Sequence, residues 1–399
     1  MRRVLDMNHL IHPTRLPTGA QKSRRLLFIA SEGRFFVSHR LPLAQTALQR
    51  GYEVAVACPE TDIKEILQKN GFLYFEIFLR RNSRSPWNEL RSLGSILKVV
   101  LKFRPNVVHL ITAKPIIYGG IIARFLRVRS LSAITGLGHV FLHHSLGKRV
   151  LRKLVVMGYR LAVGHRLSTL IFQNDSDLGT FRAYGLLSSA NHVMIRGSGT
   201  DLDRITPAPL PDGPTVVVLP ARLLLDKGLA EFFEAARLLK ARGVPAVFRL
   251  LGDRDKDNPT SVSLSTLQSW VDSGVLEWHP FQSNISAALA NSHIVVLPSY
   301  REGFPKTLID AAAAGRAAAA SNVPGCRDAI VPGVTGVLFE PRDASDMARV
   351  LEPLILDRAL QTRMGAAARA HAEANFDVRR VSDAHIRIYE DLTSHHRGA

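Results

Sequence analysis

The stretch HIVVLPSYREGFPKTLIDAAAAG, residues 293–315, decides the fold. Residues 293–298 form a short apolar run that is typical of a buried parallel strand, and residues 307–314 follow a helical pattern. The loop between them has Gly303 at its apex, followed by Phe304. A strand, a glycine-containing loop and a helix in this order expose backbone N–H groups at the helix N-terminus, where a phosphate or a polar sugar can bind.

Two carboxylates lie in this stretch. Glu302 is in the loop, and Asp310 is expected on the first turn of the helix. Both could accept paired hydrogen bonds from vicinal hydroxyls, as acidic side chains do for ribose in dinucleotide-binding folds. A loop charge and a helix-start charge favoured by the helix dipole would give the same spacing. The carboxylates alone therefore leave both interpretations open.

A second strand-to-helix turn, VVVLPARLLLDKG at residues 216–228, carries two cations. Arg222 offers a fixed fork of donors for a phosphate, and Lys227 offers a mobile point charge. Taken alone, they fit solvated surface charges almost as well. Together with the carboxylate pair, which follows another strand of the same domain, they favour a site for a diphosphate joined to a sugar.

The same alternation of strands and helices runs through the chain. It implies parallel sheets covered by helices on both faces, with ligands bound beyond the carboxyl ends of the strands. A stretch with four prolines, residues 197–214, separates two such halves. Apolar runs predict strands at residues 25–30, 53–57, 107–111, 131–135, 216–219 and 247–251, and helical patterns cover residues 41–49 and 229–241.

The predicted fold class is therefore α/β, with two doubly wound Rossmann-like domains that face a central cleft. We expect a disordered leader at residues 1–23, domains at residues 24–200 and 201–380, and a C-terminal helix at residues 381–399 that can return to the first domain. Residues 317–320 are four alanines where the pattern calls for a β-branched strand.

Charge is distributed unevenly along the 399 residues. The first 200 residues hold 30 Lys and Arg against 10 Asp and Glu, whereas the remainder holds 22 against 24. Basicity confined to one half indicates that one domain faces an anionic partner. Two cysteines are too few for a disulfide framework or a cysteine-based zinc cluster. The sequence predicts neither a membrane span nor a secretory signal.

Two basic segments of the first half are candidates for that partner. Residues 146–166 predict a basic amphipathic helix, which can lie on an anionic membrane or pack its apolar stripe against the core. Arg80, Arg81 and Arg84 form a basic loop suited to a pyrophosphate or to lipid headgroups. The expected apolar stripe of the helix consists of Leu146, Val150, Leu151, Leu154, Val155, Leu161 and Ala162.

At this point the sequence resembles family 4 of the retaining glycosyltransferases, which have the GT-B fold. The family signature is an arginine and a lysine five residues apart, followed by E-x7-E; Arg222, Lys227 and Glu302 match it, and Asp310 replaces the second glutamate. The resemblance implies that Arg222 and Lys227 bind the donor diphosphate and that Glu302 contacts the donor sugar. It also implies that Asp310 holds the ribose and that Gly303 and Phe304 offer backbone N–H groups to the sugar.

The N-terminal half resembles one branch of this family, through residues 38–44, 113–119 and 135–139, with residues 323–328 of the second half. That branch extends undecaprenyl-diphosphate-linked sugars and includes bacterial N-acetylgalactosaminyltransferases. The resemblance implies that residues 24–200 bind the acceptor and that residues 201–380 bind a UDP-sugar. It implies a peripheral enzyme on the inner face of the cytoplasmic membrane, with no metal or other cofactor.

Four residues of the first domain are candidate ligands under this resemblance. Gly33, in the loop at residues 31–34, would bring backbone close to the diphosphate, or it serves an ordinary tight turn. His39, at the start of the first helix, is a candidate for sugar or acceptor binding, or a buried or capping histidine. Lys114 is a further candidate. His139 lies near the place of the histidine by which many members of the family contact the donor sugar.

Two other functions are consistent with parts of the sequence. A GT-B UDP-sugar 2-epimerase would share both lobes and the UDP site. A nucleic-acid-binding protein would use the basic first half, although that half has neither a helix-turn-helix pattern nor strands that interleave aromatic and basic residues.

Overall fold

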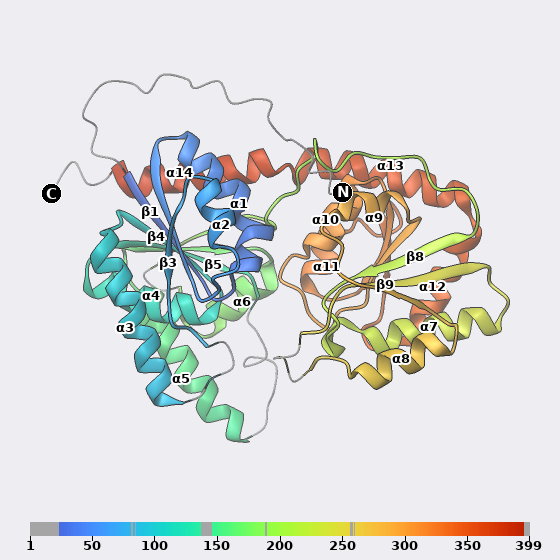
Figure 1. The fold of residues 1–399 in the computed structure, drawn as a ribbon, viewed down its shortest axis with the longest axis horizontal. Helices are drawn as coiled ribbons and strands as arrows, with labels where there is room; N and C mark the ends of the chain where they lie inside the picture. Colours follow the sequence, from blue (N-terminus) through green and yellow to red (C-terminus); the bar gives the residue numbers. More distant parts are fainter. Residues whose placement is uncertain are drawn as a thin grey trace, which may run out of the picture.

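The computed structural model describes residues 24–80, 83, 85–136, 146–187, 190–255, 258 and 260–394, with backbone alone for 146–150. The predicted leader lies outside the described residues, as do Arg81, Arg84 and His139. The chain forms two lobes, each built on one parallel sheet (Figure 1).

The N-terminal lobe contains a sheet in the order β3-β2-β1-β4-β5-β6-β7, with every described pair parallel. Its inner strands are apolar and buried almost throughout, as expected for strands covered on both faces. The strands are β1 (Arg24–Ala30), β2 (Tyr52–Cys58), β3 (Leu73–Glu76), β4 (Val107–Ile111), β5 (Arg129–Ile134), β6 (Ser168–Phe172) and β7 (Asn191–Met194).

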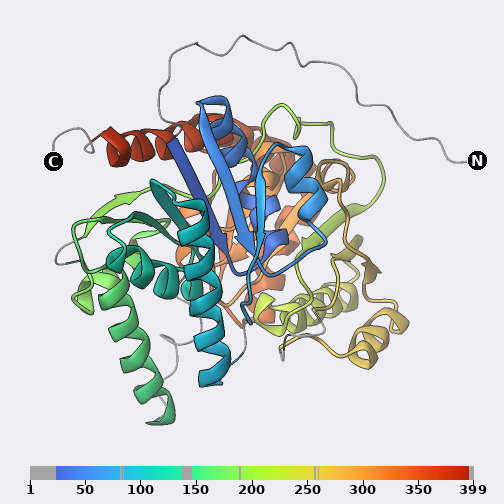
Figure 2. The same cartoon turned by 60° about the vertical axis from the view of Figure 1, so that its left-hand side comes forward.

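Helices cover both faces of this sheet (Figures 1 and 2). Each face has its own buried apolar cluster. One face carries α3 (Pro86–Phe103), α4 (Ala113–Phe125), α5 (Leu146–Val163) and α6 (Asp175–Ala183). The other carries α1 (Gly33–Gln49), α2 (Lys64–Lys69) and α14 (Val378–Ser394).

The C-terminal lobe repeats the design with a sheet in the order β10-β9-β8-β11-β12-β13. Its strands are β8 (Thr215–Pro220), β9 (Ala246–Leu251), β10 (Glu277–His279), β11 (Ile294–Leu297), β12 (Ala317–Ser321) and β13 (Gly336–Phe339). Its helices are α7 (Leu229–Ala241), α8 (Leu264–Asp272), α9 (Ile285–Ala290), α10 (Lys306–Ala313), α11 (Pro324–Ala329), α12 (Ala344–Leu356) and α13 (Arg358–Asn375).

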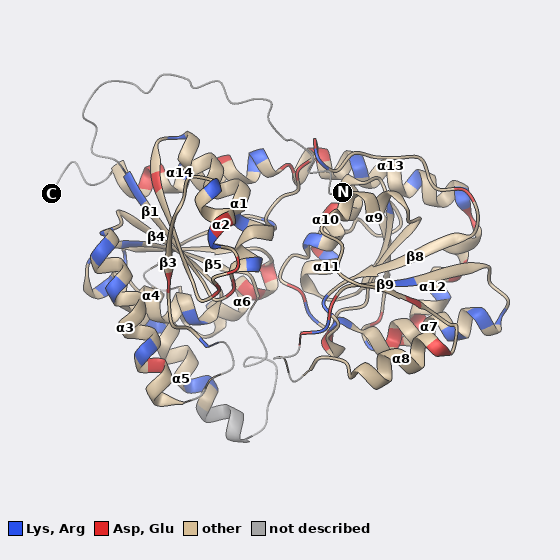
Figure 3. Ribbon diagram, viewed as in Figure 1, with Lys and Arg blue, Asp and Glu red and all other residues tan. Residues whose placement is uncertain are grey.

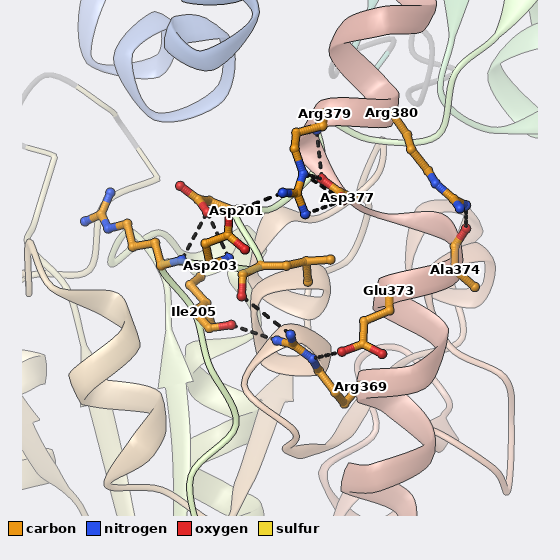
Figure 4. A network of polar contacts seen from close by, with 11 residues as sticks. Asp201, Asp203, Ile205, Arg369, Glu373, Ala374, Asp377, Arg379 and Arg380 are labelled. Carbon is orange, nitrogen blue, oxygen red and sulfur yellow. Dashed lines mark hydrogen bonds and ion pairs between the residues drawn. The ribbon is translucent and has the colours of Figure 1, made fainter. Parts of the chain in front are cut away.

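The two passages of the chain between the lobes lie side by side. Thr200 accepts a hydrogen bond from the Val378 N–H at 2.9 Å, and its own N–H donates to the Phe376 carbonyl at 2.8 Å. Beside them, Arg369 of α13 donates to the Ile205 carbonyl at 2.8 Å (Figure 4). After this crossing α14 packs on α1, so the C-terminal helix is part of the N-terminal lobe.

The alanine strand also forms. β12 lies between β11 and β13 and is buried along its whole length. Helices α10 and α13 both lie against it, and a Cβ on Gly365 of α13 would come within 2.2 Å of the Gly315 carbonyl after α10. Three elements packed this closely leave room for small side chains only, which explains alanine where a β-branched residue is usual.

Three local predictions were wrong. The first helix starts at Gly33, because the loop after β1 is only Ser31 and Glu32. Asp310 lies on the second turn of α10, since that helix starts at Lys306. The predicted apolar stripe of α5 is divided, because Leu154 and Leu161 are exposed on the outer face; the pattern alone does not show which side of a helix meets the sheet.

Candidate active site

Glu302 and Lys227 come together at the carboxyl end of the second sheet. Glu302 follows β11, and Lys227 ends a single turn, Leu225–Lys227, after the neighbouring strand β8. Lys227 Nζ lies 2.5 Å from Glu302 Oε1, and the two side chains are only 22% and 14% exposed. Lys227, predicted to bind the diphosphate, and Glu302, predicted to contact the sugar, therefore lie in one site.

Arg222 faces the other lobe. Its guanidinium lies 3.4 Å from Asp255 Oδ2 and 3.9 Å from Glu32 Oε2. Glu32 lies in the loop after β1 of the N-terminal lobe, whereas Arg222 follows β8 of the C-terminal lobe. The carboxyl ends of both sheets thus meet where the two lobes are in contact, and doubly wound sheets bind their ligands beyond those ends.

Asp310 is buried beside the crossing between the lobes. Its Oδ1 accepts hydrogen bonds from Thr200 Oγ1 and from Lys306 Nζ, each at 2.7 Å. The residue is 4% exposed. Asp310 is therefore held by neighbouring side chains, and its predicted contact with ribose stays a prediction.

The loop between β11 and α10 places its backbone against the N-terminal lobe. Among the described residues no hydrogen-bond acceptor is found for the N–H groups of Gly303 and Phe304. The Phe304 side chain is 6% exposed and packs on Phe376, with ring centroids 5.5 Å apart. This anchor fixes the loop, and the contact of its backbone donors with a sugar stays a prediction.

Gly33 and His39 both lie on α1, and their contact with a substrate stays a prediction. The Gly33 N–H donates to Glu60 Oε2 at 2.7 Å, so a carboxylate of the same lobe takes this donor. The His39 ring stacks on Phe35 with centroids 4.1 Å apart. Desolvation of the ring, and then the positive charges of Lys306 and Arg40, lower the pKa of His39 to about 3. His39 therefore faces the C-terminal lobe as a neutral ring.

Lys114 holds a loop in place. Its ammonium donates to the Arg80 carbonyl at 2.8 Å and the Ser83 carbonyl at 3.0 Å, and it pairs with Glu89 of α3 at 2.8 Å. These contacts use all three of its donors, which gives Lys114 a structural role. A substrate contact by Lys114 or Arg80 stays a prediction.

Several residues where the two lobes meet did not stand out in the sequence. Each lies between the carboxyl end of a strand and the first turn of the helix that follows it, a position where doubly wound sheets bind ligands. The sequence indicates that position, but not which of these residues make contact with the other lobe. From the N-terminal lobe they are Glu32, Asn174 and Asp177; from the C-terminal lobe they are Asp255, Arg301 and Lys306.

The two lobes match two families of known proteins. Residues 25–174 match the glycosyl transferase 4-like family, and residues 204–371 match the glycosyl transferases group 1. An N,N'-diacetylbacillosaminyl-diphospho-undecaprenol alpha-1,3-N-acetylgalactosaminyltransferase of Campylobacter jejuni is 26% identical, over 92% of this chain and 98% of its own. The capsular polysaccharide biosynthesis glycosyltransferase CapM of Staphylococcus aureus is 23% identical, over 85% and 91%.

Solved structures agree on the fold. Sucrose-phosphate synthase of Thermosynechococcus elongatus superposes with a TM-score of 0.77 at 17% identity, covering 93% of this chain and 100% of that one. Anabaena HepE in complex with UDP-glucose gives 0.73 at 17% identity, covering 93% and 99%. The chain is therefore a glycosyltransferase with the GT-B fold, made of a glycosyl transferase 4-like lobe and a group 1 lobe.

Proposed function

We propose that this glycosyltransferase moves a hexosyl or N-acetylhexosaminyl group from a UDP-sugar to a polyprenyl-diphosphate-linked glycan, with retention at the anomeric carbon, in the assembly of a bacterial surface glycan. The observation that carries the donor site is the pairing of Lys227 with Glu302, with Arg222 on the neighbouring loop. A cation can bind the diphosphate and a nearby carboxylate can accept hydrogen bonds from the sugar that is joined to it. The Campylobacter relative, named for a diphospho-undecaprenol acceptor, supports the choice of acceptor.

The reaction follows from these charges. The bond between the anomeric carbon and the diphosphate oxygen breaks, and its electron pair stays on the diphosphate. Arg222, Lys227 and the loop N–H groups would stabilise that charge because they are in place before it develops. The acceptor hydroxyl oxygen forms the new bond on the same face, and its proton passes to the departing diphosphate. Glu302 would hold the sugar hydroxyls, so no protein nucleophile is required.

A donor screen followed by a transfer assay tests this function. UDP and UDP-sugars should raise the melting temperature more than GDP, ADP, GDP-sugars or ADP-sugars do, because a ligand that binds the native state stabilises it. The preferred UDP-sugar, radiolabelled, should then deliver its label to a polyprenyl-diphosphate glycan in the organic phase. Label found instead in an epimerised nucleotide sugar would favour the 2-epimerase and contradict the proposal.

The acceptor lipid requires contact with a membrane, and we propose α3 and α5 for it. Among the described residues no helix is both long enough and apolar enough to cross a bilayer. On α3, however, four apolar side chains at helical spacing are exposed on the side away from the core: Trp87 at 70%, Leu90 at 60%, Leu97 at 37% and Leu101 at 53%. Exposed apolar stripes of this kind mark interaction surfaces.

Basic residues border this stripe. Arg91, Lys98 and Lys102 lie along its edge, and the single acid of α3, Glu89, is already paired with Lys114. Helix α5 repeats the arrangement, with exposed Leu154, Met157 and Leu161 beside Lys153 and Arg160. Figure 3 shows the cations of both helices on one side of the N-terminal lobe. An apolar stripe with a basic border fits an anionic lipid surface better than nucleic acid.

A further inference from the structure

Glu302 has a neighbour on each side that is held by the other lobe. Asn174, which caps α6 in the loop after β6, donates its side-chain amide to the Gly303 carbonyl at 2.8 Å. Asp177, on the first turn of α6, accepts a hydrogen bond from Arg301 at 2.7 Å. One contact fixes the backbone after Glu302, and the other fixes the side chain before it. We call this group of four residues the α6 clamp.

The two clamp residues of the N-terminal lobe are joined to each other. The Asn174 side-chain oxygen caps α6 by accepting the Asp177 N–H at 2.8 Å, and its amide also donates to Asp177 Oδ2 at 3.0 Å. Asn174 is 0% exposed and Asp177 is 1% exposed. Each of the two carboxylate oxygens therefore has one partner, Arg301 on Oδ1 and Asn174 on Oδ2.

Burying the charged Asp177 carboxylate costs desolvation free energy, so it has to be compensated by specific partners. Desolvation raises the pKa of Asp177, and the charge of Arg301 opposes that rise. A buried carboxylate is tolerated when a cation and hydrogen-bond donors compensate it. Here the cation comes from the other lobe, so the compensation exists only where the two lobes touch.

Gly303 is also confined from the N-terminal lobe. A Cβ at this position would lie 2.1 Å from the carbonyl oxygen of Thr135, which directly follows β5. Since β5 and β6 are neighbours in the sheet, the segments that follow two adjacent strands both contact the loop between β11 and α10. The loop that carries Glu302 is thus shaped by both lobes.

We propose that Asn174 and Asp177 are positioning residues, which act through Gly303 and Arg301 to present Glu302 to the donor sugar when the lobes meet. The inference rests on the proposed function. Arg222 and Lys227 belong to the C-terminal lobe alone, so UDP would bind without the clamp. Transfer would require it, because a displacement of about 1 Å at a reacting centre costs about a hundredfold in rate.

The simpler interpretation is that these contacts only hold the lobes together. The chain offers a matched control for it. Arg196 and Asp328 also form an ion pair between the two halves of the chain, at 3.0 Å, and among the described residues no ion pair joins either of them to residues 301–303. If lobe cohesion were the whole effect, Asp328→Asn would reduce turnover as the clamp variants do.

The main test compares three variants with that control. Asn174→Ser keeps an oxygen that can cap α6 but removes the amide donor to Gly303, and Asp177→Ala removes the partner of Arg301. For both we expect kcat to fall about tenfold or more, with the Kd for UDP within about twofold of wild type. The double variant Asp177→Ala/Arg301→Ala should be no slower than Asp177→Ala, because the two residues act as one unit.

Hydrogen exchange gives a readout that does not depend on the sugar. In the free protein, Asn174→Ser should speed exchange in the peptide covering residues 298–308, whereas Asp328→Asn should leave it unchanged. Wild-type kcat and exchange in Asn174→Ser and Asp177→Ala would overturn the clamp, as would an equal loss of kcat in Asp328→Asn. Failure of the wild-type protein to transfer from any UDP-sugar would instead overturn the proposed function.

Discussion

Lys227 connects the two parts of the donor site, since its ammonium already touches Glu302 and is the nearest described cation to that carboxylate. We expect Lys227→Ala and Arg222→Ala each to lower kcat/KM by about a hundredfold or more, because a preorganised charge at the leaving group is lost. Steady-state transfer measured with the UDP-sugar chosen by the screen checks this result.

A surface cation provides the control for these variants. Arg237 pairs with Glu234 on the exposed side of α7, so Arg237→Ala removes the same charge away from the cleft. Its turnover should equal that of the wild type, and circular dichroism should be the same for all three variants. Wild-type turnover in Lys227→Ala would remove Lys227 from the donor site.

The sequence predicted the site residues that follow adjacent strands of one sheet. Lys227 and Glu302 each lie a few residues beyond an apolar strand, and both strands belong to one sheet, so their meeting follows from local patterns. Glu32 and Asn174 could not be assigned in that way. They reach the site because the second lobe is placed against the first, and no local pattern encodes that placement.

Helix α3 gives a test of the membrane face at the scale of one element. Leu90→Glu/Leu101→Glu should weaken binding to phosphatidylglycerol vesicles about tenfold or more, because two apolar side chains that would enter the lipid are replaced by charges that the anionic surface repels. Both side chains are exposed, so the fold should not change. Co-sedimentation with vesicles measures the binding.

The control uses an equally exposed leucine in the other lobe. Leu356, the last residue of α12, is 60% exposed. The Leu356→Glu variant should bind vesicles as the wild type does. Binding should also fall as salt rises, since the basic border of α3 is attracted through screened charges. Equal binding of the double variant and the wild type would contradict a membrane role for α3.

Strand β12 tests the account of its alanines. Ala319 is 0% exposed and lies between packed helices, so Ala319→Val should destabilise the protein by about 1–3 kcal/mol through overpacking. Ala246→Val on the half-buried strand β9 should change stability much less. Denaturant unfolding of both variants decides the matter, and no destabilisation by Ala319→Val would show that β12 has room for larger side chains.

The elements themselves were largely predictable. The strand at residues 107–111 and the helix at residues 229–241 were predicted with the bounds that the structure has, because their apolar periods are uninterrupted. Helix α5 was harder, since its sequence carries two apolar rows, one facing the sheet and one facing outward. Only the packing on α4 selects which row is buried.

The molecule as a whole is closed by α14, and this closure buries two histidines. His109 of β4 and His385 of α14 are both 0% exposed, and their rings stack with centroids 5.8 Å apart. His109 Nδ1 lies 2.5 Å from the Tyr389 hydroxyl, and His385 Nδ1 donates to the Val381 carbonyl at 2.7 Å. Burial, and then the charge of Arg40, holds the pKa of His109 well below its ordinary value and lowers that of His385 to about 3.

These depressed pKa values predict how stability depends on pH. In the unfolded chain both histidines take up a proton near pH 6.5, whereas in the folded protein they stay neutral to much lower pH. Their contribution to stability is therefore complete above about pH 6.5 and is lost as pH falls, by up to about 1.4 kcal/mol per pH unit for each histidine. Urea unfolding at pH 8, 6 and 5 measures the loss, and His385→Leu should lose stability less steeply because one titrating group is gone. An equal slope for His385→Leu and the wild type would show that acid acts elsewhere than at the contact between α14 and the N-terminal lobe.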